Sequence, residues 1–166
     1  KTLVLQLQYN GSRYHGWQRQ CNTRSTVEQK LIEALEQIWP QHLELPQIYC
    51  AGRTDCGVHA LGQVLSIDLS SLELRSTHSF KAGLNHFLPH DIVVANARIV
   101  HEKFHARFDA SWRQYLYIFD NQASLFQQHQ VTPLAVNVDL NILNECAKLI
   151  CGRHNFSSFQ GGSCQA

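Results

Sequence analysis

Residues 48–69 read I-Y-C-A-G-R-T-D-C-G-V-H-A-L-G-Q-V-L-S-I-D-L and place a polar, glycine-flanked turn between two apolar runs. The run Ile48–Ala51 is typical of a short strand that leads into the turn 52–57. The segment Gly62–Leu69 alternates between apolar and polar residues and predicts a second strand. A polar turn at the end of a strand is a position where sheets present functional groups.

The hydrophobic pattern outside this segment predicts further strands and helices. The strands are expected at Thr2–Gln8, Ile92–Val100 and Trp112–Phe119, and the helices at 25–38, Arg75–Phe87 and Leu140–Ile150. Ser25 and Glu28 match a capping box at the start of the first helix. This order of elements predicts an α/β (α+β) fold of ferredoxin-like, RRM-like type, with a mixed, largely antiparallel sheet and helices on one face.

The order of elements begins again after about residue 101, which predicts a domain boundary there. Residues 1–100 would form a ferredoxin-like α/β domain carrying the polar turn, and residues 101–166 the first part of a second, truncated α/β domain. The chain has no methionine and ends without terminator signals, so we expect it to be a fragment.

The composition describes a folded domain rather than a disordered or membrane protein. Of the 166 residues, 44% are hydrophobic and 16% are charged, and no apolar run approaches the length of a membrane span. No secretory leader is visible, and we expect a cytosolic protein. Its cysteines form no C-x-x-C pair and are expected to be reduced thiols: Cys21, Cys50, Cys56, Cys146, Cys151 and Cys164.

The charge distribution is uneven although the net charge is only +1. Residues 1–27 contain four basic residues and no acid, while the rest holds ten basic and thirteen acidic residues. Such a basic arm is consistent with a patch that contacts phosphates. Charge alone favours the other interpretation, a solvated, arginine-rich loop.

Asp55 is the first candidate for chemistry, because the glycines around it place its carboxylate on a sharp turn. Arg53 lies two residues before it and could keep the carboxylate ionised. An ionised carboxylate can act as a nucleophile, a base or a metal ligand. The alternative is that Asp55 only accepts hydrogen bonds from backbone amides of the turn.

Cys56 and His59 offer a rival interpretation, as a thiolate–imidazole pair or, with Cys50, as three zinc ligands. Their spacing lacks the paired pattern of structural zinc sites, so we expect no metal, a small buried Cys56 and a hydrogen-bonded His59 that supports the turn. Tyr115 and Tyr117 could stack on an unpaired base or could belong to the core.

Six stretches together resemble the tRNA pseudouridine synthase A family, which converts uridines 38 to 40 of the tRNA anticodon stem-loop to pseudouridine. They follow the family's order across nearly the whole chain: Y-N-G-S-R-Y-H-G-W-Q (9–18), A-G-R-T-D-C-G-V-H-A (51–60), L-N-H-F-L-P-H-D-I (84–92), F-H-A-R-F (104–108), R-Q-Y-L-Y (113–117) and G-R-H-N-F-S-S-F (152–159). The resemblance implies the pseudouridine synthase fold.

The resemblance also assigns roles to individual residues. It implies that Asp55 is the essential catalytic carboxylate and that Arg53 helps to extrude the uridine. It implies that Tyr115 packs against the uracil and that Arg107 contacts phosphate. Weaker candidates for RNA contact are Arg13, Arg75 and His105. No cofactor is implied, and the partners implied are tRNA and a second copy of the chain in a homodimer.

The chain departs from the family pattern at Cys56, where alanine is usual, and at Asn155, where aspartate is usual. The pattern also continues past Ala166, where the family carries an arginine that pairs with the catalytic aspartate. We therefore expect little activity from these 166 residues alone. A non-catalytic RNA-binding module on the same fold is the alternative function.

Overall fold

The structure, a computed structural model, describes residues 1–101, 103–122, 124–134 and 138–159. The chain divides into two compact units, Lys1–Leu116 (unit 1) and Tyr117–Ala166 (unit 2), which are described separately. The two domains 1–100 and 101–166 remain a proposal from the sequence.

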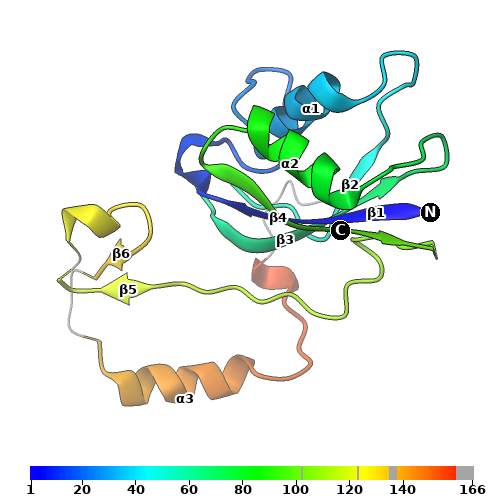
Figure 1. Ribbon diagram of the computed structural model, residues 1–166. Helices are drawn as coiled ribbons and strands as arrows, with labels where there is room; N and C mark the ends of the chain where they lie inside the picture. The colour runs from blue at the N-terminus through cyan, green and yellow to red at the C-terminus, as the bar shows by residue number, and fades with distance from the viewer. Residues whose placement is uncertain (102, 123, 135–137, 160–166) are drawn as a thin grey trace. The chain divides into compact units, whose positions relative to one another are not determined.

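The described part of unit 1 contains one four-stranded sheet, two α-helices and a short 3-10 helix, η1 (Gly11–Arg13). Its elements follow the order β1 (Thr2–Tyr9), α1 (Val27–Ile38), β2 (Ile48–Cys50), β3 (Ala60–Asp68), α2 (Thr77–Phe87) and β4 (Ile92–Val100). The strand order is β2-β3-β1-β4, and every neighbouring pair is antiparallel. Both helices cover the same face of the sheet (Figure 1). The predicted ferredoxin-like α/β fold is therefore confirmed.

The core lies between the sheet and the helices. Successive residues of a strand point to opposite faces, and Leu3, Leu5 and Leu7 of β1 are fully buried on the helix side. Their partners on β3 and the inner face of α1 complete the layer: Leu65, Ile67, Val27, Leu31, Ala34 and Leu35. This apolar layer fixes the register of the strands, because a slip by one residue would turn the leucines outward.

The first helix begins one residue later than the capping box predicted. Thr26, not Ser25, is the N-cap, and its hydroxyl accepts a hydrogen bond from the Gln29 amide. The Glu28 carboxylate instead accepts from the Arg19 amide at 2.7 Å. The capping-box prediction was therefore wrong, because Thr26 can also cap a helix and Glu28 is used in a tertiary contact.

The predicted strand Trp112–Phe119 was also largely wrong. Only Phe119–Asp120 (β5) is a strand, and it pairs in parallel with Thr132–Pro133 (β6). Residues 112–118 belong to no strand. Alternating side chains favour an extended backbone, but a strand also requires a neighbour for its hydrogen bonds. Within 112–118, the backbone hydrogen bond that the structure gives is at the end of the range, where the Ile118 carbonyl accepts from the Thr132 amide at 2.8 Å.

Unit 2 contains β5, β6, two short 3-10 turns and α3 (Leu140–Ile150). The bounds of α3 match the prediction, and Asp139 caps it by accepting a hydrogen bond from the Asn141 amide. No described residue of unit 2 is buried. In the described ranges, the structure contains no helix with the length and apolar character of a membrane span.

Candidate active site

Asp55 lies in the turn between β2 and β3, at the end of the sheet where Tyr9 pairs with Ala60. Its side chain is exposed. None of the described residues forms a hydrogen bond or an ion pair with its carboxylate, and only its backbone carbonyl is used, accepting from the Val58 amide at 3.2 Å. The alternative that Asp55 merely accepts backbone hydrogen bonds within the turn has no support here. The carboxylate is available to a ligand.

The segment 10–17 holds this turn in place from one side. The Trp17 amide donates to the Thr54 carbonyl at 2.9 Å, and the Gly57 amide donates to the Tyr14 carbonyl at 3.1 Å. The Thr54 hydroxyl also hydrogen-bonds the Tyr9 hydroxyl at 2.8 Å. These bonds reach residues on both sides of Asp55, so the backbone at Asp55 is fixed even though its side chain is open to solvent.

Two glycines make this close approach possible. A methyl group at Gly11 would lie 2.0 Å from the Val58 carbonyl oxygen, and one at Gly16 would lie 2.7 Å from that of Thr54. The Gly11 amide donates to Nδ1 of His59 at 3.2 Å, which confirms that His59 supports the turn. Neither the basic charge of this segment nor its likeness to the family predicts that it packs against the turn. The two glycines indicate this packing, because a residue without a side chain allows another backbone to approach closely.

Arg53 is exposed and forms no ion pair with Asp55 among the described residues. The charge attraction that the sequence suggested between Arg53 and Asp55 therefore does not take the form of an ion pair. An exposed ion pair gains little electrostatic free energy in water and loses side-chain entropy when it forms. Arg53 is therefore not held against Asp55.

The stretch 104–109 crosses the sheet on the face away from the helices. Ala106 is buried, and its amide donates to the Ser66 hydroxyl at 3.0 Å. The His105 ring packs against Tyr49, with ring centroids 4.3 Å apart, and against Phe108 at 4.4 Å. Ser66 lies between the inward-facing Leu65 and Ile67, so it points to the opposite face of β3.

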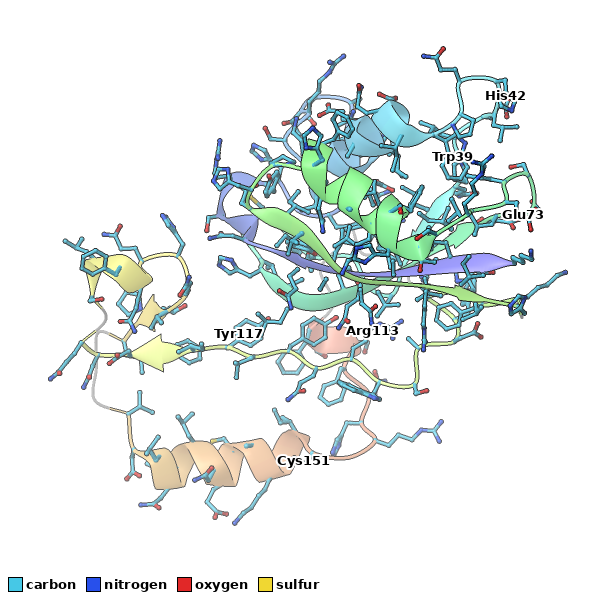
Figure 2. All side chains as sticks on the ribbon, in the orientation of Figure 1. Trp39, His42, Glu73, Arg113, Tyr117 and Cys151 are labelled. Carbon is cyan, nitrogen blue, oxygen red and sulfur yellow. The ribbon has the colours of Figure 1, made fainter. Side chains whose placement is uncertain are left out.

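Arg113 connects this stretch to the start of the turn. Its Nε donates to the Ala51 carbonyl at 2.8 Å and its Nη2 to the Arg107 carbonyl at 2.9 Å. Figure 2 shows Arg113 on the side of the sheet opposite the helices. The Tyr115 hydroxyl would lie 3.6 Å from a methyl group at Gly52. The structure therefore brings Arg107 and Tyr115 next to the residues that precede Arg53.

The two weaker arginine candidates lie at opposite ends of the sheet. Arg13 belongs to the segment that holds the turn, and its exposed guanidinium lies 3.7 Å from Asp91. Arg75 lies in the loop after β3, at the end where Asp68 pairs with Thr2. The structure does not bring Arg75 near Asp55, because the eight residues of β1 separate the two ends by about 25 Å.

The cysteines form no site in the described part of the chain. No group of three His, Cys, Asp or Glu side chains there could hold a metal, and the five cysteines described are unbridged. Burial raises the pKa of the Cys50 thiol to about 11, which keeps it protonated at neutral pH. Cys56 is exposed, not buried as predicted, because it faces outward from the turn. Cys164 lies outside the described residues.

The fold and this site define an α/β protein of ferredoxin-like topology with an exposed carboxylate at one end of its sheet, to which none of the described residues is bonded. The model of the tRNA pseudouridine synthase family matches residues 6–109, which contain the turn and the segment that holds it. The chain belongs to this family.

Relatives match across almost the whole chain. The tRNA pseudouridine synthase A of Histophilus somni is 42% identical over 99% of this chain and 60% of its own length. The proteins of the same name from Pseudoalteromonas atlantica and Citrobacter koseri are 40% and 38% identical over 99% of this chain, which covers 61% and 59% of their lengths. The chain thus spans about three fifths of these relatives.

Proposed function

We propose that this chain is part of a tRNA pseudouridine synthase that isomerises uridine to pseudouridine, with Asp55 as the catalytic carboxylate. The observation that carries the proposal is the state of Asp55. Its side chain is exposed and without a partner among the described residues, while the backbone on both sides of it is held by hydrogen bonds. A carboxylate that has a fixed backbone and is not hydrogen-bonded to other described residues is suited to reaction with a bound substrate.

The reaction breaks the N1–C1′ bond of the nucleotide, turns the uracil and joins C5 to C1′. The proton on C5 is released and N1 takes up a proton, so the product is an isomer of the substrate. Asp55 would act at the sugar or at the base: by attack at C1′, by attack at C6, or by abstraction of the C2′ proton toward a glycal. Each route requires the carboxylate to be ionised. It also requires the uridine to leave its stack, at a cost of a few kcal/mol.

Three residues near the turn could bind the extruded nucleotide. Arg53 would fill the space that the base leaves, Tyr115 would pack against the uracil, and Arg107 would contact a phosphate. The support for this division is their placement: Arg113 joins the backbones of Ala51 and Arg107, and the Tyr115 hydroxyl approaches Gly52. His105 and Arg13 would add contacts to the RNA.

The finer features of the proposal come from the resemblance. The substrate would be the tRNA anticodon stem-loop with uridines 38 to 40, the whole protein would be a homodimer, and it would act in the cytoplasm. Mapping pseudouridines in tRNA from cells that lack the gene tests which uridines are modified. We expect pseudouridine to be lost at positions 38 to 40 and retained elsewhere.

Asp55→Asn in the complete protein tests the role of the carboxylate. The measurement is tritium release from anticodon stem-loop RNA labelled at C5 of uridine, together with the Kd for that RNA. We expect release to fall by about 10³-fold or more, while Kd changes by less than about threefold.

Asp68→Asn is the matched control, because it removes the same charge at the other end of the sheet, where Asp68 accepts a hydrogen bond from the Ser70 amide. It should retain wild-type release. Tight RNA binding by the wild-type protein without any tritium release would instead favour the RNA-binding module.

A further inference from the structure

The hydrogen bond between Tyr14 and Asp91 has no role in the chemistry proposed above. It is nevertheless connected to the catalytic turn, because the Tyr14 carbonyl accepts a hydrogen bond from Gly57. We infer that Tyr14 and Asp91 form a positioning pair that holds the turn around Asp55 in its working conformation. The inference rests on the proposed function of Asp55, and it adds two residues that touch neither substrate nor reacting atoms.

Tyr14 is buried, Asp91 is partly buried, and the hydrogen bond between them is short. The Tyr14 hydroxyl donates to Oδ1 of Asp91 at 2.5 Å, Tyr14 is 6% exposed and the Asp91 side chain 9%. Hydrogen bonds to a charged acceptor are roughly twice as strong as neutral ones. Burial, followed by the bond to Asp91, raises the pKa of Tyr14, so the hydroxyl keeps its proton and remains the donor at all physiological pH values.

Tyr14 is held at three points, and one of them is the catalytic turn. Its amide donates to the Gly11 carbonyl at 2.9 Å, its hydroxyl donates to Asp91, and its carbonyl accepts from the Gly57 amide at 3.1 Å. Gly57 is two residues after Asp55. Any shift of Tyr14 is therefore transmitted to the backbone beside the catalytic carboxylate.

Asp91 is itself anchored to the sheet. It directly precedes β4, whose first residue, Ile92, pairs with Tyr9 of β1, and its carbonyl accepts from the Asn10 amide at 2.9 Å. The carboxylate therefore has a fixed position relative to β1. Its second oxygen, Oδ2, is buried and has only Arg13, at 3.7 Å, as an ionic neighbour among the described residues.

The ring of Tyr14 would fill its place in the core without the hydroxyl. The hydrogen bond of the hydroxyl therefore fixes the rotation of the Tyr14 side chain. Through the side chain it also fixes the orientation of the Tyr14 carbonyl that faces Gly57. A carboxylate displaced by about 1 Å from its working position can lose about a hundredfold in rate.

Tyr14→Phe in the complete protein tests the inference, with wild type and Asp55→Asn measured in parallel. We expect kcat for tritium release to fall by about tenfold to a hundredfold, with the Kd for the stem-loop changed by less than about threefold. Amide hydrogen exchange provides a readout that needs no activity, and the Gly57 and Trp17 amides should exchange faster.

Asp91→Asn and Asp91→Ala separate the hydrogen bond from the charge. The asparagine retains Oδ1 as an acceptor for Tyr14, so its exchange at Gly57 should remain close to that of wild type. The alanine removes the acceptor and should behave like Tyr14→Phe. Equal exchange at Gly57 in Asp91→Asn and Asp91→Ala would overturn the inference.

Trp39→Phe is the control for a general loss of stability. It removes the partly buried hydrogen bond from Trp39 to the Glu44 carbonyl, which lies beyond the C-terminal end of α1, and should leave kcat unchanged. If Tyr14→Phe matches this control in both kcat and Gly57 exchange, the pair is merely structural and the inference is wrong. If wild type releases no tritium, the proposed function fails, while faster exchange at Gly57 would still support the role of the pair.

Discussion

Unit 1 and unit 2 differ in how their elements are stabilised. In unit 1, a continuous apolar layer lies between the sheet and two helices, with Leu3, Leu31 and Leu65 among its fully buried residues. In unit 2, α3 forms with the predicted bounds, yet its apolar residues are exposed, Leu143 at 50% and Ile150 at 60%. Local sequence is thus enough to define a helix, but the turn that carries Asp55 depends on a core.

Two leucines in the middle of helices provide the strongest test of this difference. Leu31→Ala in α1 removes a fully buried side chain and should lower the free energy of unfolding by about 2–5 kcal/mol. Leu143→Ala in α3 should change it by less than about 0.5 kcal/mol, because half of the side chain is already in water. Urea unfolding of residues 1–166, followed by circular dichroism, measures both. Equal losses would mean that unit 2 has a core of its own.

A smaller effect is expected at the glycines that allow the turn and its supporting segment to approach. Gly16 and Gly57 both have positive φ, +85° and +79°, so alanine is strained at either position. Gly57→Ala meets no atom within 4 Å and should cost about 1 kcal/mol. Gly16→Ala also meets the Thr54 carbonyl at 2.7 Å and should cost a further 1–3 kcal/mol or so.

Thermal unfolding of the two glycine variants checks this order. If Gly57→Ala proves the more damaging of the two, the close packing of Gly16 on Thr54 is not what fixes the turn. Activity of the complete protein should follow the same order, because only Gly16→Ala is expected to push the turn away from its support.

A still smaller change in stability is expected at Arg113. Arg113→Lys keeps the charge but cannot donate to the Ala51 and Arg107 carbonyls with one planar group, and should cost about 1 kcal/mol. The Kd for stem-loop RNA should rise if the hydrogen bonds of Arg113 order Arg107. Arg98→Lys, an exposed arginine on β4, is the matched control and should leave both quantities unchanged. Identical behaviour of the two variants would contradict a bridging role.

The reactivity of one cysteine in each unit provides another comparison, and it can be measured at neutral pH without a change in the stability of either unit. Cys50 of unit 1 has its pKa raised to about 11 by burial, so only about one thiol in a thousand is a thiolate at pH 8. Cys146 of unit 2 is exposed. Iodoacetamide should modify Cys146 at least about tenfold faster, as measured by mass spectrometry of the two peptides.

The raised pKa of Cys50 also makes stability depend on pH. The ordinary pKa of the thiol is 9.0, so the folded state holds the proton more tightly than the unfolded state. The contribution of Cys50 to the free energy of unfolding is therefore fully present below pH 9 and should be lost as the pH rises through about 11. Cys50→Ala should reduce this slope without abolishing it, because the pKa values of Tyr9 and Tyr14 are also raised in the folded state. An unchanged slope would show that Cys50 makes no contribution to it.

The sequence predicted best those elements whose pattern is both local and strongly periodic. β4 and α3 have the predicted bounds, since alternation and helical spacing are properties of the segment itself. Residues 112–118 alternate equally well and form no strand, because pairing depends on a neighbour that no local pattern identifies. The choice between Ser25 and Thr26 as N-cap was likewise made by tertiary contacts.

For the candidate site, the sequence indicated the reactive group but not its support. The turn around Asp55 was recognisable from its glycines and its position after a strand. The hydrogen bonds from Trp17, and those to Tyr14 and Asp91, join segments about 40 to 80 residues apart. Such contacts follow from the order of strands in the sheet, which spacing alone does not reveal.

The central place of β1 in the sheet has a consequence for how the protein is made. β1 leaves the ribosome before its two partners, β3 and β4, which end only at Asp68 and Val100. At about 5–20 residues per second, translation leaves β1 without its second partner for on the order of 5–20 s. During that interval Leu3, Leu5 and Leu7 are open to chaperones or to other nascent chains, so the strand that later supports the catalytic end of the sheet is the one most at risk of aggregation during synthesis.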